Sequence, residues 1–348
     1  MSRARRRVPG PKSMRVLIVK LSSLGDVVHT LPVVADIRAA HPGARIDWVV
    51  EPAFAPLVAR VDGIADVIQC PLRRWTSEGW WRAQTRAEAR AFVRRLRRER
   101  YDAVLELQGL TKAALIAAQP RGPSFALANR TDGASHEWPA RVLATHAIRV
   151  EPHSHALDRA RELVSKALGT RIDTLPSFGL RARSGAVPNG ARTVVLIHGT
   201  SRDDKLWPDA HWIELGRRLV DEGWRVALPQ AGGAEGARAK VIAEAIGGAH
   251  SAVWPAMELG AFIDRLAGVQ GAIGIDSGPS HIAVALGLPH VQIYNFPTAW
   301  RTGPQPRHGA GLQVSVEDDP TPTVGAVWSA WKSVQDAVRA HVAAGPRA

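Results

Sequence analysis

The sequence contains one cysteine and no long apolar run, and both shortages exclude whole classes of protein. A single cysteine, Cys70, permits neither a disulfide framework nor a cysteine-based zinc site, which fits a reducing cytoplasm. It ends the apolar run ADVIQC, so we expect a small buried side chain. No apolar stretch approaches the ~20 residues that a membrane-spanning helix needs. The basic segment MSRARRRVPGPKS (1–13) is followed by no apolar region of the secretory type, and we interpret it as a disordered tail.

Acidic residues are also fewer than basic residues. The chain has 45 lysines and arginines against 32 acidic residues, a formal net charge of +13. Such an excess favours nucleic acid, an anionic membrane surface or a phosphorylated substrate as partner. The basic residues concentrate at RRW (73–75) and at RAFVRRLRRER (90–100), where Phe92, Val93 and Leu96 are expected to face inward from a solvated helix. No zinc-finger spacing, RNP-like strand or clear helix-turn-helix accompanies them, so we expect a lipid surface or phosphate-rich substrate and no nucleic acid.

Short apolar runs alternate with stretches of helical spacing in both halves of the chain. In the first half, strands are predicted at 15–21, 46–50, 66–70, 102–107 and 125–128, with helices over 27–40 and 84–100. In the second half, strands are predicted at 193–199, 225–229, 251–254, 271–276 and 290–295, with helices over 209–222, 235–246, 258–267 and 278–287. This alternation predicts an α/β protein with two doubly wound parallel sheets, each covered by helices on both faces.

The stretch PSFGLRARSGAVPNGAR (176–192) lacks periodicity, and its glycine, proline and serine content is typical of a linker. We therefore predict a first domain over 14–180, a linker over 181–192 and a second domain over 193–322. A terminal amphipathic helix and tail are expected over 323–348, with an apolar stripe of Val327, Trp331, Val334, Val338 and Val342.

Ligands of doubly wound sheets bind at the carboxyl ends of the strands, and the first such end carries the turn KLSSLGD (20–26). Gly25 permits a tight turn, and Ser22 and Ser23 offer hydroxyl groups. The turn has neither the G-x-G-x-x-G pattern nor the Gly-Lys-Ser/Thr of a Walker A loop. The spacing alone leaves Asp26 equally well explained as a helix cap or as a catalytic base.

Two turns of the second half are suited to phosphate. HGTSRDDKLWP (198–208) places Thr200, Ser201, Arg202 and Lys205 after a strand, although an ordinary polar loop would look similar. DSGPSHIAVALG (276–287) places Ser277 and Gly278 at a helix start. There Asp276 would suit a sugar hydroxyl or fix the loop, and His281 could equally be an interior histidine.

Other catalytic patterns are missing. There is no G-x-S-x-G nucleophile elbow. His153 and His155 in HSHALDR are two residues apart before a predicted helix, which is poor spacing for two metal ligands on one helical face, so no metal site is expected.

Six motifs carry a family resemblance. MRVLIVKLSSLGDVVHTLP, RIDWVVEPAF, RRW, HGTSRDDKLWP, HWIELG and GIDSGPSHIAVALGLP, in this order over residues 14–340, resemble the lipopolysaccharide heptosyltransferases, most closely their heptosyltransferase I branch. The resemblance implies a GT-B architecture, in which two Rossmann-like domains face each other across a cleft. It further implies inverting transfer of heptose from ADP-L-glycero-β-D-manno-heptose to the Kdo of Kdo2-lipid A, without an obligatory cofactor or metal.

The resemblance also implies a role for each matched residue. Asp26 matches the catalytic base and Lys205 the cation on the donor diphosphate, with Thr200 and Ser201 as its hydroxyl neighbours. The other matches fall into three groups: phosphate and heptose contacts at Asp276, Ser277, Gly278 and His281; nucleoside contacts at Glu235 and Met257; and acceptor contacts at Ser23, Gly25, Arg73 and Arg74. The family often has Arg-Glu-Pro where this chain has His136-Glu137-Trp138, with Arg130 and Arg141 nearby.

The expected enzyme is a monomer in the cytoplasm, peripheral on the inner face of the inner membrane. Two other classes stay open: heptosyltransferase II or another sugar-nucleotide transferase of the same fold, and a non-catalytic nucleotide- or nucleic-acid-binding protein, which the charge suggests.

Overall fold

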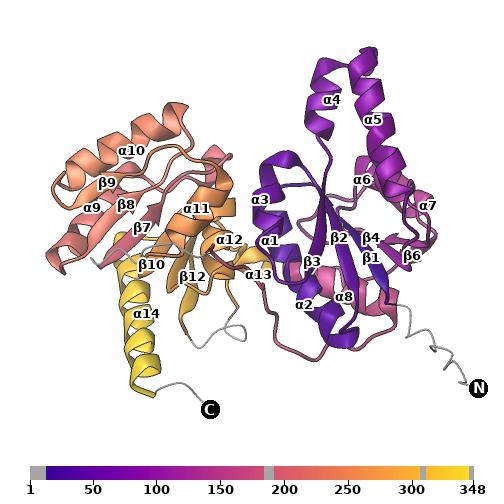
Figure 1. Cartoon of the computed structure of the whole chain (residues 1–348). Coiled ribbons are helices and arrows are strands. Elements are labelled where there is room, and N and C mark those ends of the chain that lie inside the picture. The colour runs from indigo at the N-terminus through magenta and orange to yellow at the C-terminus, as the bar shows by residue number, and fades with distance from the viewer. Residues whose placement is uncertain (1–12, 184–191, 306–310, 345–348) are drawn as a thin grey trace, which may run out of the picture.

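Two parallel sheets, each flanked by helices, make up the computed structural model, which describes residues 13–183, 192–305 and 311–344 (Figure 1). We call the first sheet with its helices the N-terminal domain and the second the C-terminal domain. The predicted tail and most of the predicted linker lie outside the described residues. The predicted α/β class with two doubly wound sheets is confirmed.

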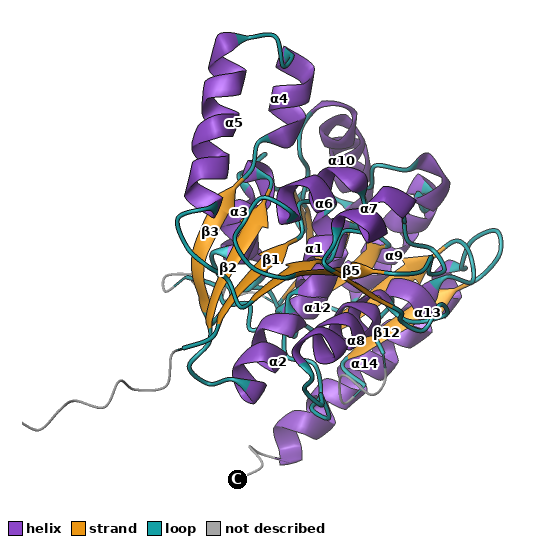
Figure 2. Cartoon of the chain, turned by 90° about the vertical axis from the view of Figure 1, so that its right-hand side faces the viewer, coloured by secondary structure: helices purple, strands orange, loops and turns teal. Residues whose placement is uncertain are grey.

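The first sheet has the strand order β3-β2-β1-β4-β5-β6, and all of its pairings are parallel. Its strands are β1 (Arg15–Val19), β2 (Arg45–Val50), β3 (Ile64–Gln69), β4 (Ala103–Glu106), β5 (Ser124–Leu127) and β6 (His146–Ile148). Its helices are α1 (Leu24–Thr30), α2 (Pro32–Ala40), η1 (Pro52–Phe54), α3 (Ala55–Val58), α4 (Leu72–Glu78), α5 (Ala83–Leu96), α6 (Thr111–Ala117), α7 (Trp138–Leu143) and α8 (Ala156–Leu168). Crossover helices cover the sheet, so its central strands are almost wholly apolar and buried (Figure 2).

The second sheet repeats this plan in the order β12-β11-β10-β7-β8-β9. Its strands are β7 (Thr193–Ile197), β8 (Arg225–Leu228), β9 (Ser251–Val253), β10 (Gly271–Ile275), β11 (His290–Tyr294) and β12 (Gln313–Glu317). Its helices are η2 (Asp203–Lys205), α9 (Asp209–Asp221), α10 (Gly233–Ile246), α11 (Leu259–Leu266), α12 (Gly278–Ala285), α13 (Ala299–Thr302) and α14 (Val324–Ala344).

The ten predicted strands are all present, and three details differ from prediction. The helix expected over 27–40 is two helices, because Pro32 begins a new one. The edge strands β6 and β12 were not predicted. The apolar stripe of α14 holds at Val327, Trp331 and Val334, but Val342 is 74% exposed, since the end of the helix extends past the sheet (Figure 1).

The two domains share one apolar core, where α1 packs against α12 and α3 against α11. Residues of α1 such as Val27 belong to the same buried cluster as Ile282 of α12 and Phe262 of α11. An ion pair between Arg60 and Asp264, with N to O distances of 2.7 and 3.2 Å, joins the domains beside this core. The carboxyl edges of both sheets are thereby held facing each other.

Candidate functional site

A cavity of about 780 Å³ lies between the two domains. Twelve residues predicted from the sequence line it: Ser23, Gly25, Asp26, Thr200, Ser201, Lys205, Glu235, Met257, Asp276, Ser277, Gly278 and His281. Two predicted residues do not. The Arg73 guanidinium carbon is 5.9 Å from the ring centroid of Phe54, which does line the cavity. Arg74 points to Glu78 and Glu88 on the α4–α5 hairpin.

Asp26 stands in the first turn of α1, where Ser23 caps the helix. Both the backbone N–H and the hydroxyl of Ser23 donate to the same carboxylate oxygen, Oδ2, at 3.1 and 2.6 Å. Within the described residues, Oδ1 has no hydrogen bond. The capping box therefore fixes the carboxylate and leaves one oxygen available. The N-cap is thus Ser23 and not Asp26, for which a cap was one of the two roles left open by the sequence; Asp26 takes the third helical position of the capping box, and that place is compatible with a role as base.

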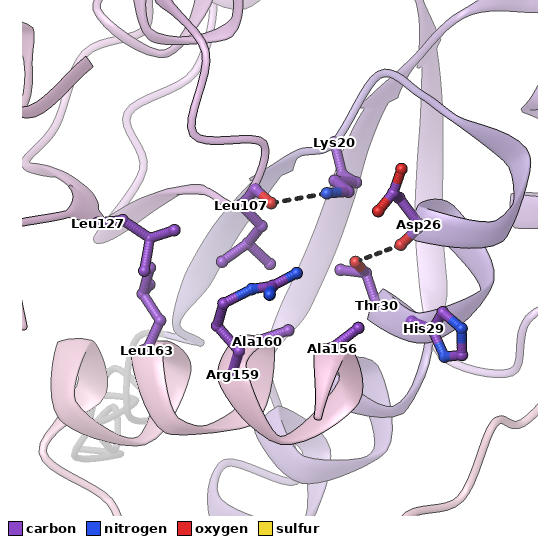
Figure 3. Close-up of a pocket in the computed structure, with 10 residues that line it drawn as sticks. All are labelled: Lys20, Asp26, His29, Thr30, Leu107, Leu127, Ala156, Arg159, Ala160 and Leu163. Carbon is purple, nitrogen blue, oxygen red and sulfur yellow. Dashed lines mark hydrogen bonds between the residues drawn. The ribbon is translucent and has the colours of Figure 1, made fainter. Parts of the chain in front are cut away.

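Two cations lie behind Asp26 (Figure 3). Lys20, at the end of β1, is buried and donates a 2.9 Å hydrogen bond to the Leu107 carbonyl. Arg159 reaches toward it from α8. Burial alone would raise the pKa of Asp26, but the charge of Lys20, the hydrogen bonds from Ser23 and the charge of Arg159 outweigh burial and lower it. Asp26 is therefore ionised at neutral pH and able to accept a proton.

A second carboxyl group lies deeper, at the end of β4. Glu106 is buried and accepts hydrogen bonds from the backbone N–H groups of Gln108 at 2.8 Å and Gly109 at 2.9 Å. Burial raises the pKa of Glu106 to about 7, against these hydrogen bonds and the charge of Lys20. Its bonds hold the loop after β4, whose Gln108 side chain donates to the Ser22 carbonyl and accepts from the Leu21 N–H. Glu106 thus supports the turn that carries Asp26.

The opposite wall carries a cation bound to a carboxylate. Lys205 Nζ donates to Asp276 Oδ2 at 2.5 Å, and His281 Nε2 lies 3.2 Å from Oδ1. Thr302 donates to the same Oδ1 at 3.4 Å. Burial would raise the pKa of Asp276, but His281 and Lys205 together hold it well below its ordinary value. Two roles were predicted for Asp276, binding a sugar hydroxyl or fixing the loop, and these contacts agree with fixing the loop.

Glu235 faces the same cavity from α10 at the far end of the C-terminal domain. Its Oε2 accepts the Ala231 N–H at 3.1 Å, and burial raises its pKa. Gly199 lies directly beneath it: a Cβ at that position would lie 1.8 Å from Oε1, so the Glu235 side chain would have to move. Met257 lines the same end. A carboxylate beside an apolar wall is a suitable environment for the hydroxyls and the flat face of a nucleoside.

The turns before α1 and α12 touch across the domain boundary. A Cβ on Gly25 would lie 2.8 Å from Cδ2 of His281, and a Cβ on Gly278 would lie 2.7 Å from Leu24. The His29 ring, buried beneath them, lies 4.3 Å from the His281 ring between centroids. Burial lowers the pKa of His29 well below its ordinary value, and the nearby His281 and His155 add to this. The two glycines therefore allow the close approach of the two helix starts.

Sequence reasoning missed several residues of the site. Arg159 and Arg301 line the cavity, but Arg159 ends the HSHALDR segment, which was considered only for metal binding, and Arg301 sits in a helix without a motif. Lys20 had an available signal, since it is the first residue of the predicted turn KLSSLGD at the end of a strand. Arg202 was considered with the Lys205 loop and lines the cavity beside it, where it pairs with Asp204.

The segment that departs from the family pattern stays outside the cavity. Glu137 accepts the Thr111 N–H at 2.8 Å and Trp138 is 73% exposed. His136, Arg130 and Arg141 do not line the cavity either. Arg159 of α8 does line the cavity, on the same side as Asp26.

In the part of the chain that the structure describes, no group of three or more His, Cys, Asp or Glu side chains is placed to hold a metal ion. His155 caps α8 by accepting the Leu157 N–H, and His153 pairs with Asp132 at 2.9 Å. Cys70 is buried, as predicted. Among the same residues, no helix combines the length and the apolar character needed to cross a bilayer.

The sequence pattern of glycosyltransferase family 9 (heptosyltransferase) matches residues 89–325. The chain belongs to glycosyltransferase family 9. This family 9 glycosyltransferase is 38% identical over 285 residues to lipopolysaccharide heptosyltransferase 1 of Escherichia coli (strain K12), covering 81% of this chain and 88% of the relative. It is 27% identical over 306 residues to lipopolysaccharide heptosyltransferase 2 of the same strain, covering 81% and 82%. The resemblance to the heptosyltransferase I branch is thus confirmed.

Solved structures agree with the GT-B arrangement of this family 9 enzyme. The structure of E. coli heptosyltransferase WaaC with ADP matches at a TM-score of 0.79 and 32% identity, covering 93% of this chain and all of that one. The structure of WaaC with ADP-2-deoxy-2-fluoro heptose matches at a TM-score of 0.74 and 33% identity, covering 94% and 99%. The predicted architecture of two Rossmann-like domains is therefore confirmed.

Proposed function

We propose that the enzyme transfers L-glycero-D-manno-heptose from ADP-heptose to the Kdo of Kdo2-lipid A, with inversion at the anomeric carbon, in lipopolysaccharide inner-core synthesis. One observation carries the proposal: a single cavity has the half-free carboxylate of Asp26 on one wall and Lys205 beside the start of α12 on the other. The relatives named heptosyltransferase 1, and the matched structures titled with ADP and a heptose analogue, support the same substrates.

The acceptor wall supplies the base. In the proposed step an acceptor hydroxyl attacks the anomeric carbon, its proton passes to the unbonded oxygen of Asp26, and the bond from that carbon to the β-phosphate oxygen breaks. Lys20 and Arg159 keep Asp26 ionised before the step. Ser23, Gly25 and Arg159 line the acceptor side, and Arg73 lies just beyond it, where acidic sugars can be met by cations. Arg74 would take part only after leaving its glutamate partners.

The donor wall stabilises the leaving group. An ammonium has three N–H donors, and Asp276 is the partner of one of those of Lys205, so others can reach the diphosphate. Ser277, Gly278 and the backbone N–H groups that begin α12 add neutral donors at a positive helix end. Thr200 and Ser201 line the loop beside Lys205. These groups supply the electrostatic stabilisation of developing phosphate charge that other transferases take from a divalent ion.

The nucleoside and the cellular setting complete the proposal. Glu235 would accept ribose hydroxyls, and Met257 would pack on the base. Asp276 and His281 orient Lys205 and the α12 turn around the heptose and phosphates. We further propose that the active form is a monomer. A lipid-linked acceptor supports a peripheral position on the inner face of the inner membrane, and we propose no obligatory cofactor.

The test is ADP release from ADP-heptose with and without Kdo2-lipid A, in buffer with and without a chelator. We expect rapid release only when the acceptor is present, unaffected by the chelator. Release that requires an already heptosylated acceptor would identify heptosyltransferase II instead. Salt-dependent DNA binding without ADP-heptose affinity would overturn transferase function altogether.

A further inference from the structure

Most of the net charge of the chain sits in one structural feature. Residues 72–100 contain ten arginines and three glutamates, a net charge of +7. Residues 1–12, with four arginines and one lysine, carry +5, which leaves +1 of the total +13 for the rest of the chain. The +7 segment consists of the α4–α5 hairpin and the turn after it, and the hairpin projects from the N-terminal domain (Figure 1). The α4–α5 hairpin therefore carries a concentrated positive charge, which favours an anionic partner at this surface.

Two tryptophans form the tip of this hairpin. Trp80 is 46% exposed and Trp81 is 77% exposed, between the end of α4 and the start of α5. Large aromatic side chains in such a position are unfavourable in water and point to an interaction surface. Tryptophan, with an apolar ring and a polar N–H, is enriched where a bilayer meets water.

The tip is held in place by the hairpin itself. Buried Trp75 packs against Phe92 and Trp80, with ring centroids 5.7 and 6.0 Å apart, and donates to Glu88 at 2.9 Å. The Arg86 guanidinium donates to the carbonyls of Trp80 and Trp81. The exposed indoles are thus presented on a preformed turn, so little ordering is needed on binding.

A row of arginines runs from the tip along α5. All ten arginines of the segment are exposed. Arg74 and Arg95 pair with carboxylates, but within the described residues no ion pair is made by Arg82, Arg90 or Arg94. Residues four apart lie side by side on a helix, and like charges at that spacing repel. An unpaired row of this kind favours an anionic surface outside the protein.

We propose that Trp80 and Trp81 insert into the headgroup region of an anionic lipid bilayer, while Arg82, Arg90 and Arg94 bind its phosphate groups. The inference rests on the proposed function in one respect, that the acceptor is anchored in such a bilayer. The geometry suits it: α4 starts at the carboxyl edge of the first sheet, and Arg73 at its base lies over Phe54 of the cavity. With ~1.5 Å per residue, the 14 residues of α5 place the tip about 20 Å from the base.

Flotation of the full chain with vesicles tests the surface directly. We expect binding to vesicles of phosphatidylglycerol and phosphatidylcholine, and little to phosphatidylcholine alone. Arg90→Gln/Arg94→Gln should weaken the partition coefficient roughly 30-fold, since each arginine near an anionic surface contributes about a factor of five. Trp81→Ala should weaken it on the order of tenfold.

Matched controls lie elsewhere on the chain. Trp138→Ala removes an equally exposed tryptophan, 73% accessible, from α7. Arg225→Gln/Lys240→Gln makes the same charge change at exposed positions of the C-terminal domain. Both should bind vesicles like the wild type. Equal losses in the controls, or equal binding to neutral vesicles, would overturn the assignment to the hairpin, as would an unchanged partition coefficient in the hairpin variants.

A fluorescent probe tests insertion of the tip. Cys70 is buried, and burial raises the pKa of its thiol to about 12, so a thiol reagent labels the Trp81→Cys variant selectively. An environment-sensitive label there should shift its emission to the blue on anionic vesicles, and the same label on Trp138→Cys should not. An unshifted emission at Trp81→Cys would overturn insertion.

Activity separates this inference from the proposed function. With a water-soluble Kdo acceptor without acyl chains, Arg90→Gln/Arg94→Gln should retain the wild-type kcat/KM, whereas with Kdo2-lipid A in vesicles kcat/KM should fall with the partition coefficient. Equal loss on both acceptors would place these arginines in the site and overturn the docking inference. Vesicle binding that depends on the hairpin, without heptose transfer to any acceptor, would support docking and overturn the proposed function.

Discussion

The turns that open α1 and α12 both place a serine and a glycine at the start of a helix, but their carboxylates have different surroundings. Each follows a buried strand, places a serine before the helix and uses a glycine for close approach to the other domain. In the first, Asp26 lies inside the helix and keeps one oxygen without a hydrogen bond among the described residues. In the second, Asp276 precedes the helix and both oxygens have partners.

The difference shows that a carboxylate's role is set by its bonding partners more than by its motif. A base needs an unoccupied oxygen and a nearby charge that keeps it ionised, and Asp26 has both. Asp276 is ionised too, but both of its oxygens are already occupied by contacts with Lys205 and His281. In the proposed reaction, the first turn is thus suited to accept a proton and the second to hold cations in place.

The sharpest test exchanges the two carboxylates for amides. Asp26→Asn keeps the shape but removes the proton acceptor, so kcat should fall roughly 10³-fold while ADP affinity stays constant. Asp276→Asn should mainly weaken ADP affinity, because Lys205 and His281 lose their anchor. Steady-state kinetics and calorimetric ADP titration give both numbers. If Asp26→Asn mainly weakened ADP affinity and Asp276→Asn mainly lowered kcat, the roles proposed for the two carboxylates would be wrong.

Removing the cation of the second turn should have the next largest effect. Lys205→Ala should lower kcat/KM for ADP-heptose roughly 10- to 100-fold, because a charged hydrogen bond to phosphate is lost. Arg202→Ala is the control from the same loop. Its guanidinium is occupied by Asp204, so a change under about threefold is expected. The measurement is kcat/KM for ADP-heptose at saturating acceptor. An unaltered kcat/KM in Lys205→Ala would show that Lys205 has no role in binding the donor diphosphate.

The contact between the turns can be disturbed by one methyl group. Gly25→Ala would place a Cβ 2.8 Å from His281, so the helix starts must separate, and kcat/KM should fall roughly tenfold. Gly43→Ala is the control, since nothing lies within 4 Å of its added Cβ. Kinetics with the melting temperature Tm as a folding check decide the outcome. Wild-type kinetics in Gly25→Ala would mean that the turns need not touch during turnover.

The smallest effect concerns pH. The charge of Lys20 lowers the pKa of Asp26, and activity of a carboxylate base is lost as the pH falls through its pKa. Lys20→Met should therefore raise that pKa and move the acidic limb of kcat/KM to higher pH, with little change above neutrality. Lys166→Met, which removes an exposed lysine paired with Glu162, should leave the limb in place. An unmoved limb in Lys20→Met would assign it to a group other than Asp26.

Most of the fold could be predicted because buried parallel strands are continuous apolar runs. VLIV of β1 and VVLI of β7 are wholly buried, and such runs between turns have few other interpretations. The edge strands escaped prediction for the same reason. HAI of β6 is three residues long and mostly exposed, and QVSVE of β12 alternates like an amphipathic segment. Their pairing depends on neighbouring strands that are distant in sequence.

In the candidate site, too, residues with a local sequence signal could be predicted and residues placed by tertiary packing could not. Residues in turns at strand ends, such as Asp26, Lys205 and Ser277, could be found from local pattern, and the structure brings them to one cavity. Arg159 and Arg301 could not, because they enter from helix faces that only tertiary packing points inward. Arg73 and Arg74 were expected at the acceptor, but the hairpin turns Arg74 away toward Glu88.

The cation-rich donor wall has a consequence for the catalytic cycle. Lys205 and the start of α12 are placed where, in the proposed reaction, negative charge grows on the departing β-phosphate. The β-phosphate of free ADP carries more negative charge than that of ADP-heptose. The donor wall should therefore bind the product ADP more tightly than it binds the donor ADP-heptose. In the proposed reaction we therefore expect release of ADP to limit turnover, and ADP to compete with its own sugar conjugate for the cavity.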